Sequence, residues 1–460
     1  MTSDISGTIA ARLDRLVFSA SLKKLVLLIS LGGAFEFYDL FMTAYIAPGL
    51  IAAHLFSANA ARFFAPNGVG FFVFCTFAGM WAGSIGFGFI ADQLGRRAIF
   101  TFSLLWYCAA TLVMAFQTSA QGIDLWRFIA AIGVGLEQIT IDTLLPELVP
   151  AESRGRAFAF NQLIEFSVVP VVALLGWLLV PLHPFGIDGW RCVALIGTVG
   201  ALVAWWLRLT VPESPRWLAL HGREAEAEAV MQKLEAGVAR DIGHDLLPPR
   251  PQAAPPPEQG SLGEIMRPPY RARTVMLSVF NLMQSIAFYG FGSWVPSLLI
   301  AKGIHVTTSL EYAFIIALAN PVGPLLGFLV ADRMERKWQL VCAGISVAVF
   351  MLLFVVQDQA VLVILFGVLV TLANNWISFA THNYQAELYP TRIRARAIGF
   401  VYSWSRVSAA LAGLLIGFFL RAGGTLGVAL FIGGAMVVMV VTIGGFGPLT
   451  RGRSLEEISR

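Results

Sequence analysis

The sequence predicts an all-α membrane protein with twelve transmembrane helices, arranged as two pseudo-symmetric bundles of six. Three observations predict this fold: apolar residues come in long blocks, basic residues gather in alternate loops, and two loop motifs recur at one common spacing. Hydrophobic residues make up 57% of the 460 residues and charged residues only 13%. A soluble domain of this size would carry roughly a quarter charged residues.

The apolar blocks have the length of membrane spans, because about 20 helical residues cross a hydrocarbon core of about 30 Å. The blocks of the first half are Leu25–Leu50, Val69–Ile90, Ile99–Phe116, Leu125–Leu145, Phe158–Val180 and Val193–Leu209. Those of the second half are Val275–Ile300, Tyr312–Val330, Leu340–Val356, Val361–Ala380, Ile398–Leu420 and Leu426–Phe446. The first block is longer than a signal peptide and is followed by further spans, so we expect it to remain as helix one.

Basic residues indicate the sidedness of the chain. They cluster before the first block and after every second block, and they fill the long segment between blocks six and seven. The alternate loops hold little beyond Arg62, Arg191, Lys302 and Arg421. By the positive-inside rule, we expect both termini and the central segment to be cytoplasmic.

The central segment, residues 211–272, interrupts the hydrophobic pattern. It contains a charged, helix-prone stretch (Arg223–Glu235) and then a proline-rich tract (Pro248–Pro257) that does not form a packed structure. We therefore predict an N-terminal six-helix bundle over 1–210, a cytoplasmic linker over 211–272 and a C-terminal six-helix bundle over 273–460.

Two motifs indicate an internal duplication. The sequence DQLGRR at 92–97 has a counterpart, DRMERK, at 332–337, and ELVPAESRGRA at 147–157 has a counterpart, ELYPTRIRARA, at 387–397. Both pairs are separated by 240 positions. Two motifs with one offset indicate two homologous six-helix halves, and substrate sites in such proteins lie between the halves near the bilayer midplane.

The same residues resemble a known family. The sequence GFIADQLGRR at 88–97 resembles the loop signature of the major facilitator superfamily, and PESPRW at 212–217 resembles its sugar-porter and organic-ion branches. GAFEFYD at 33–39, and Arg127 with the glycines and acids that follow it, resemble the metabolite:proton symporter branch. The resemblance covers essentially the whole chain and implies a secondary transporter that works by alternating access.

Acidic residues inside the spans are candidates for proton coupling, because a charge at the bilayer centre costs about 3 kcal/mol or more. Glu36 and Asp39 share one face of helix one. Two carboxylates this close resist simultaneous ionisation, so we expect one to hold a proton. The alternative is a structural pair with hydrogen bonds to neighbouring helices. Glu137, near mid-depth in helix four, joins the proton pathway in the resembling symporters.

Two arginines inside the spans are candidate substrate residues. Arg406 is the only basic residue well inside helix eleven, and Tyr402 lies one turn before it. A guanidinium in a cavity binds a carboxylate through two hydrogen bonds. The alternative is a permanent salt bridge to an acid of the first half. The resemblance places Arg127 in the central cavity, and the alternative is an arginine that reaches the membrane surface.

Helices seven and ten carry polar faces that we expect to line a wet cavity, with hydrogen bonds between helices as the alternative. Trp376 offers a stacking surface for a flat substrate, or packing only. The candidates on these faces are Asn374, Ser378, His382, Gln284, Tyr289 and Trp376.

The loop motifs carry charges of both signs on the cytoplasmic side, and the resemblance implies that they latch the halves in the outward-open state. The alternative is ordinary surface charge. The latch residues of the first half and linker are Gly88, Asp92, Gly95, Arg96, Arg97, Glu147, Arg154, Glu213 and Arg216. Those of the second half are Asp332, Arg336, Glu387 and Arg394.

We expect proton-coupled uptake of a small organic anion, a carboxylate or an aromatic acid. The alternatives are a proton-coupled carrier of sugars, polyols or organic cations, an effluxer, and a membrane sensor. The sequence shows no phosphate-binding loop, metal-ligand spacing or nucleophile elbow, so we expect no cofactor, no metal and no enzymatic activity. We expect no nucleic-acid partner, and a monomer in a bacterial inner membrane.

Overall fold

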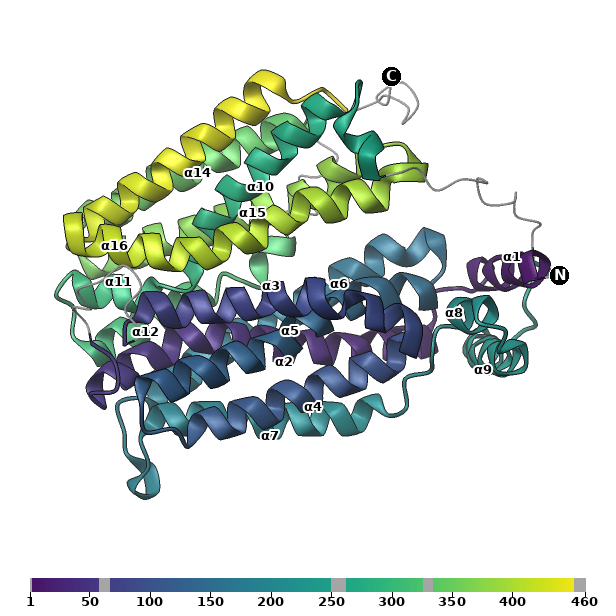
Figure 1. Cartoon of the computed structure of the whole chain (residues 1–460), viewed down its shortest axis with the longest axis horizontal. Coiled ribbons are helices and arrows are strands. Elements are labelled where there is room, and N and C mark those ends of the chain that lie inside the picture. Colours follow the sequence, from purple (N-terminus) through teal and green to yellow (C-terminus); the bar gives the residue numbers. More distant parts are fainter. Residues whose placement is uncertain (1, 58–66, 250–261, 326–333, 451–460) are drawn as a thin grey trace.

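The computed structural model describes residues 2–57, 67–249, 262–325 and 334–450, and every regular element in these ranges is helical. Helices of the two sequence halves form two groups that lie side by side (Figure 1). The N-terminal half contains α1 (Thr2–Asp14), α2 (Ala20–Ala52), α3 (Val69–Leu94), α4 (Arg96–Ala115), α5 (Ala120–Leu148), α6 (Arg154–Leu179) and α7 (Gly189–Arg208). The C-terminal half contains α10 (Arg271–Gly292), α11 (Val295–Ala301), α12 (Val306–Ala317), α14 (Arg336–Val356), α15 (Ala360–Glu387) and α16 (Thr391–Phe446).

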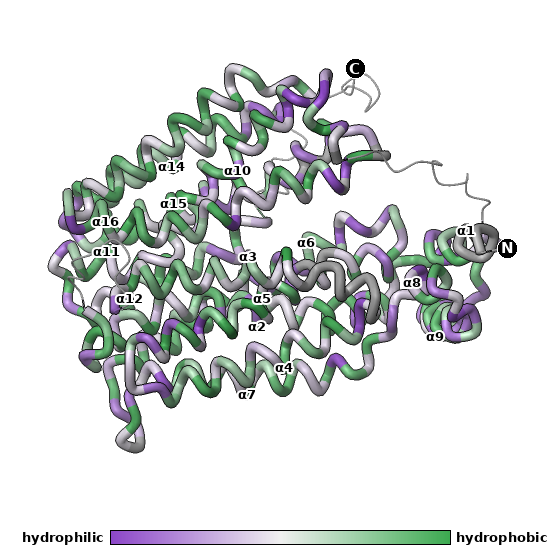
Figure 2. The backbone as a smooth tube through the Cα atoms, viewed as in Figure 1, coloured by the Kyte–Doolittle hydropathy of each residue, from purple (hydrophilic) through white to green (hydrophobic). Residues whose placement is uncertain are grey.

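Ten helices of the described residues are long and apolar enough to cross a membrane. Hydrophobic residues run along their lengths, and hydrophilic residues concentrate near their ends (Figure 2). The helix α16 contains two of the expected spans. They are separated by a kink at Gly423 and Gly424, where the backbone departs from helical geometry. Gly424 has a φ of +60°, a conformation that glycine adopts without steric cost.

The eighth expected span differs from the prediction. The apolar block Tyr312–Val330 predicts one continuous helix, but α12 ends at Ala317 and a turn follows. Pro321 explains the break, because its ring clashes with the preceding helical turn and it has no N–H to donate. The last part of the block, 326–330, lies outside the described residues.

The linker also forms helices. The charged stretch predicted as helix-prone is α9 (Glu224–Ile242), preceded by the short α8 (Pro215–Leu220). Ser214 caps α8 by accepting a hydrogen bond from the Trp217 N–H at 3.1 Å, and Pro215 takes the first helical position. We call the end of the bundle that carries α1, α8 and α9 the linker end, and the opposite end the far end (Figure 1).

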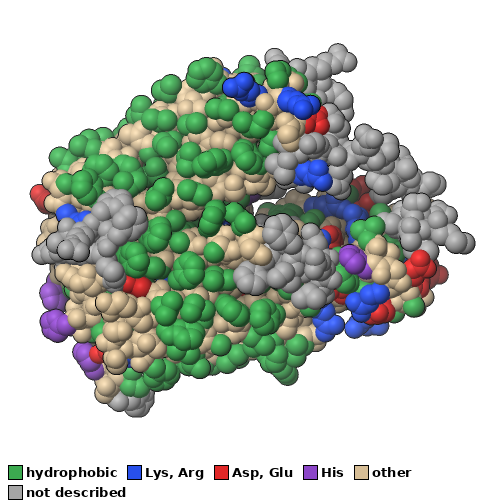
Figure 3. Space-filling model, viewed as in Figure 1, with side chains coloured by type: hydrophobic (Ala, Val, Ile, Leu, Met, Phe, Trp, Pro, Cys, Tyr) green, Lys and Arg blue, Asp and Glu red, His purple; other side chains and the backbone are tan. Residues whose placement is uncertain are grey.

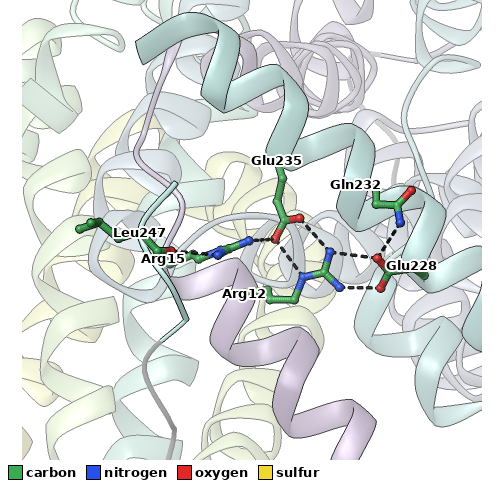
Figure 4. Close-up of polar contacts among 6 residues, drawn as sticks. All are labelled: Arg12, Arg15, Glu228, Gln232, Glu235 and Leu247. Atoms are coloured by element: carbon green, nitrogen blue, oxygen red, sulfur yellow. Dashed lines mark hydrogen bonds and ion pairs between the residues drawn. The ribbon is translucent and has the colours of Figure 1, made fainter. Parts of the chain in front are cut away.

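The sequence analysis did not anticipate α1. This helix packs on α8 and α9 and shares with them a hydrophobic cluster that includes Leu13, Trp217 and Met231. Arg12 forms ion pairs with Glu228 at 2.5 Å and Glu235 at 2.8 Å (Figure 4). These contacts therefore hold α8 and α9 against α1 at the linker end of the N-terminal half.

The two halves meet at the far end and separate at the linker end. A Cβ added to Gly70 of α3 would lie 3.0 Å from the carbonyl oxygen of Gly413 in α16, so these backbones touch. Trp177 of α6 stacks on Phe314 of α12 with ring centroids 5.8 Å apart. The space-filling view shows a hollow between the halves at the linker end (Figure 3). The protein is thus closed at the far end and open at the linker end.

Candidate transport site

Asp39 of α2 and Arg127 of α5 form a buried ion pair. The Arg127 Nη1 donates to Asp39 Oδ2 at 2.7 Å, and the Arg127 Nη2 donates to the Asp39 backbone carbonyl at 2.8 Å. Thr76 accepts from Arg127 Nε at 2.9 Å, and Thr111 donates to Asp39 Oδ1 at 3.1 Å. Arg127 is fully buried, which excludes the alternative that it reaches the membrane surface.

Glu137 of α5 is paired with Arg208 at the end of α7. The Arg208 Nη2 donates to Glu137 Oε1 at 2.5 Å, and neither side chain is exposed. The Arg208 guanidinium also lies 3.7 Å from the ring centroid of Phe100. A Cβ at Gly32 of α2 would overlap Arg208 Nη2, so glycine at that position makes room for the arginine.

The other acids of the N-terminal half are also buried. Glu36 is 1% exposed and lies one turn from Asp39 on α2. Arg127 compensates the charge of Asp39. The expectation that Glu36 or Asp39 holds a proton stays a prediction. Glu165 of α6 accepts a hydrogen bond from Asn161 at 2.7 Å and packs against Gly33.

Arg406 of α16 joins the two halves. It donates one hydrogen bond to Gln138 of α5 and another to the Tyr289 hydroxyl of α10 at 3.2 Å. Its guanidinium lies 5.5 Å from the ring centroid of Tyr402, and its exposure is 6%. Gln138 and Tyr289 are neutral partners, and they come from α5 of the N-terminal half and α10 of the C-terminal half.

A pocket of about 30 Å³ lies between the halves. Phe41, Tyr45 and Val169 line it from the N-terminal half, and α10, α12 and α15 line it from the C-terminal half. Its polar lining includes Asn320, Thr371, Asn374 and Asn375. This volume suits a few water molecules, so the pocket is constricted in this conformation.

The remaining substrate candidates lie in different environments. Asn374 lines the pocket, and its buried Oδ1 has no hydrogen-bond partner. Trp376 is directed to α14, where its Nε1 donates to Gln339 at 3.3 Å. His382 is exposed, its Nδ1 lies 2.7 Å from the Ser378 carbonyl, and its ring is 6.0 Å from that of Tyr402. Gln284 is buried on α10.

The latch residues of the N-terminal half surround the turn between α3 and α4. Glu213 accepts hydrogen bonds from the backbone N–H groups of Arg96 at 3.0 Å and Arg97 at 3.1 Å. A carboxylate at the start of α4 is favourable because helix N-termini carry a partial positive charge. Gly95 has a φ of +98°, and a Cβ there would lie 2.4 Å from Glu213. The Arg96 Nε lies 3.9 Å from Glu147.

The acid that faces Arg154 and Arg216 comes from α1. Asp14 lies 4.0 Å from Arg154 and 3.8 Å from Arg216, and it accepts a hydrogen bond from the Ala151 N–H at 2.9 Å. The N-terminal helix therefore belongs to the charged cluster at the linker end.

In the C-terminal half, Arg336 pairs with Glu387 at 2.7 Å, and Arg394 donates to the Tyr389 carbonyl at 3.1 Å. The pairs Arg96–Glu147 and Arg336–Glu387 each lie within one half, and the latch between the halves stays a prediction. Asp332 lies outside the described residues, and so does the side chain of Asp92; Gly88 is part of α3.

Sequence reasoning missed several residues near the site. Arg208 sits at the very end of a predicted span, and the need of Glu137 for a partner was the signal that could have found it. Asp124 is 3% exposed near the start of α5. Asn320 lies in the turn after α12, directly before Pro321, and that proline was visible in the sequence. Asp14 precedes the first span and looks like an ordinary terminal residue.

Comparison with known proteins decides the family. Residues 25–460 match the family described as "Sugar (and other) transporter". The chain belongs to this family. Its relatives include the metabolite transport protein YyaJ of Bacillus subtilis, 28% identical over 97% of this chain and 96% of the relative. The niacin transporter NiaP of Acinetobacter baylyi is 26% identical over 98% and 99%.

The fold agrees with that of a solved family structure. The xylose transporter XylE from E. coli, in a partially occluded inward open conformation, superposes with a TM-score of 0.75. The match covers 94% of this chain and 98% of that protein at 20% sequence identity. The chain is therefore an integral membrane transporter of the major facilitator superfamily, a secondary transporter of metabolites and not an enzyme.

Proposed function

We propose that this transporter imports a small organic anion, a carboxylate or an aromatic acid, together with protons. The observation that carries the proposal is Arg406, a buried cation that contacts both halves of the molecule. Alternating access changes how the two halves are oriented relative to each other. A ligand bound to Arg406 would therefore be contacted by both halves and would affect that change. Gln138 and Tyr289 would give up or share their hydrogen bonds when a carboxylate binds.

The chemistry of the surroundings supports an aromatic acid. A guanidinium binds a carboxylate through two parallel hydrogen bonds. Tyr289 connects Arg406 to a group of rings, with its centroid 5.0 Å from that of Phe288 and 4.7 Å from that of Phe77. Phe288 also lines the pocket. The relative that transports niacin, a pyridine carboxylate, supports the same class of substrate.

Asp39 is the proposed proton site. Its carboxylate is held by Arg127 and Thr111 inside the N-terminal half. Protonation of Asp39 would break its ion pair with Arg127 and weaken the contact between α2 and α5. Proton binding would in this way change the packing of the two helices. In this proposal Arg127 acts through Asp39, and Glu36 and Glu137 belong to the same pathway.

We further propose that the linker end is cytoplasmic in a bacterial inner membrane, with the latch motifs engaging when that end closes. The division into residues 1–210, 211–272 and 273–460 and a monomeric state complete the proposal. The hollow at the linker end would then be an inward-open cavity (Figure 3).

The test is transport by purified protein in liposomes that carry a pH indicator inside. Nicotinate, benzoate, a dicarboxylate, an amine and xylose are added separately to wild type and to Arg406→Gln. We expect only carboxylates to acidify the lumen, and we expect Arg406→Gln to lower kcat/KM by roughly 100-fold, since hydrogen bonds to charged groups contribute about 1.5–3 kcal/mol each. Arg421→Gln, an exposed arginine of the same helix, is the matched control.

Two results would contradict the proposal. One is acidification driven by the amine or by xylose and unaffected by Arg406→Gln, which would favour the cation or sugar alternative. The other is carboxylate uptake without any change in luminal pH, which would remove proton coupling.

A further inference from the structure

Asp124 is a buried acid to which neither the sequence analysis nor the proposed function gives a role. It lies on α5, four residues after the first residue of the helix, and only 3% of it is exposed. Both carboxylate oxygens are buried and have no hydrogen-bond partner among the described residues. The Cys75 thiol of α3 is close enough to feel the charges of both Asp124 and Arg127, and Arg127 follows Asp124 by three residues on the same helix.

The surroundings of Asp124 favour its neutral form. An ionised carboxylate without hydrogen-bond donors or a paired cation is costly to bury. The cation nearby is already engaged, because Arg127 directs its three nitrogens to Thr76, the Asp39 carboxylate and the Asp39 carbonyl. In this conformation Arg127 therefore pairs with Asp39 and not with Asp124.

Arg127 has two carboxylates within its neighbourhood. Residues three apart lie on one face of a helix, and Asp124 is about 4.5 Å nearer the far end along the axis, at 1.5 Å per residue. If a proton neutralises Asp39, Arg127 loses its charged partner, and a buried unpaired guanidinium is unfavourable. Asp124 is placed to supply the replacement.

We propose that Asp124 is the outer station of a proton path, and that it passes its proton to Asp39 while Arg127 exchanges one carboxylate for the other. The inference rests on the proposed proton coupling. The O–H bond of Asp124 breaks and an O–H bond on Asp39 forms, so the three groups keep one proton and zero net charge. Asp39 then releases the proton toward the linker end and Arg127 returns to it. The carboxylate of Asp124 next takes a proton from the far side.

The packing of α3 agrees with this direction. At the far end α3 separates the Asp124 region from α16, through the contact of Gly70 and Val73 with Gly413. Opening of the far end would part this contact and bring water toward Asp124. Closure, as in this conformation, isolates the protonated acid.

The first test measures protonation without any substrate. Infrared spectra of the purified wild type at neutral pH should contain the C=O band of a buried carboxylic acid that Asp124→Asn removes. In Asp39→Asn the same band should disappear, because Asp124 ionises to pair with Arg127. Asp188→Asn, an acid of a far-end loop, is the control and should keep the band. Absence of the Asp124 band in wild type, or its persistence in Asp39→Asn, would overturn the inference.

The second test separates this inference from the proposed function. With nicotinate as probe, Asp124→Asn should lose at least tenfold of pH-driven accumulation but keep exchange of internal for external nicotinate within about twofold. If wild type itself moves no protons with any carboxylate, the proposed function fails. If wild type is coupled and Asp124→Asn is equally coupled, only the role of Asp124 fails. Loss of both accumulation and exchange in a folded Asp124→Asn protein would also overturn it, since that result indicates a structural role.

Discussion

The two halves share their loop motifs but differ in the middle of the membrane. The N-terminal half contains two buried ion pairs, Asp39–Arg127 and Glu137–Arg208. The positions 240 residues after Arg127 and Glu137 are Gly367 and Ile377, and the position 240 before Arg406 is Phe166. Each half thus has charged residues where the other has apolar or small ones.

This difference indicates that the two halves took on different functions after the duplication. The loop motifs at the linker end have kept several of the same residues in both halves, including the acid and the arginine of the pairs Arg96–Glu147 and Arg336–Glu387. The interior of the N-terminal half became a set of compensated charges suited to protons. Among the described residues, the interior of the C-terminal half is mainly polar and uncharged, with Asn320, Asn374 and Asn375 at the pocket and the cation Arg406.

The largest effect should come from breaking the Glu137–Arg208 pair. Arg208→Gln leaves the Glu137 carboxylate buried and uncompensated, and removal of one partner of a buried pair costs about 3–5 kcal/mol. Thermal and denaturant unfolding in detergent should show this loss. The double variant Arg208→Gln/Glu137→Gln should recover most of it, because no charge remains. A single variant as stable as the double one would show that Glu137 is already neutral.

A smaller effect should come from the glycine beneath this pair. In Gly32→Ala the new Cβ overlaps Arg208 Nη2, and such overpacking costs about 1–3 kcal/mol. The loss should vanish in the Arg208→Gln background, which is measured by the same unfolding experiment. Gly433→Ala is the matched control, because open space surrounds that glycine. An equal loss in both backgrounds would mean that Arg208 is not the group displaced.

In the C-terminal half, removal of a buried polar group at Asn374 should not lower stability, in contrast to the N-terminal variants above. Asn374→Leu removes a buried carbonyl oxygen that has no partner, so stability should be unchanged or higher. If that oxygen receives a donor from the substrate, KM should rise roughly tenfold, which corresponds to about 1.4 kcal/mol. Asn281→Leu is the contrasting variant, because it breaks a 3.2 Å hydrogen bond to Gln385 and should destabilise the protein by about 1 kcal/mol. Stability lost in Asn374→Leu would contradict the contrast.

The smallest effect should arise outside the membrane, where α1 binds α9 (Figure 4). The hydrogen bond from Arg12 lowers the pKa of Glu228, and for Glu235 the bonds from Arg12 and Arg15 outweigh the effect of burial and lower its pKa too. The contacts therefore stabilise α1 above the ordinary glutamate pKa of about 4.3 and lose their effect as pH falls below it.

Hydrogen exchange of the α1 amides, corrected for the chemical rate, measures this contribution. Arg12→Gln should weaken protection by up to about 1 kcal/mol at pH 7, since partly exposed ion pairs contribute little, and should have no effect at pH 3. Arg223→Gln, whose ion pair is with Glu226 three residues along the chain and not with α1, is the control. Equal protection of α1 in wild type and Arg12→Gln at pH 7 would contradict the role of these contacts.

Much of the fold could be predicted from the sequence because a membrane imposes it. Span length, loop charge and the repeated motifs each follow from the bilayer or from duplication, and they predicted the helices, their pairing into halves and the linker helix α9. The break at Pro321 and the helix α1 were not anticipated. The break at Pro321 depends on which backbone groups receive hydrogen bonds from the neighbouring α15. The position of α1 depends on a docking surface formed by residues more than 200 positions away in the sequence.

The candidate site divides in the same way. Sequence alone identified Asp39, Arg127, Glu137 and Arg406, because a charged residue well inside a span is costly and therefore conspicuous. It missed Asp124 and Arg208, which lie near the ends of their spans. Only the tertiary structure decided their partners, namely Asp39 with Arg127, Glu137 with Arg208, and Arg406 with groups from both halves. The physical reason is that helix periodicity specifies a face, whereas the atoms opposite that face come from other helices whose rotation and depth are set by packing.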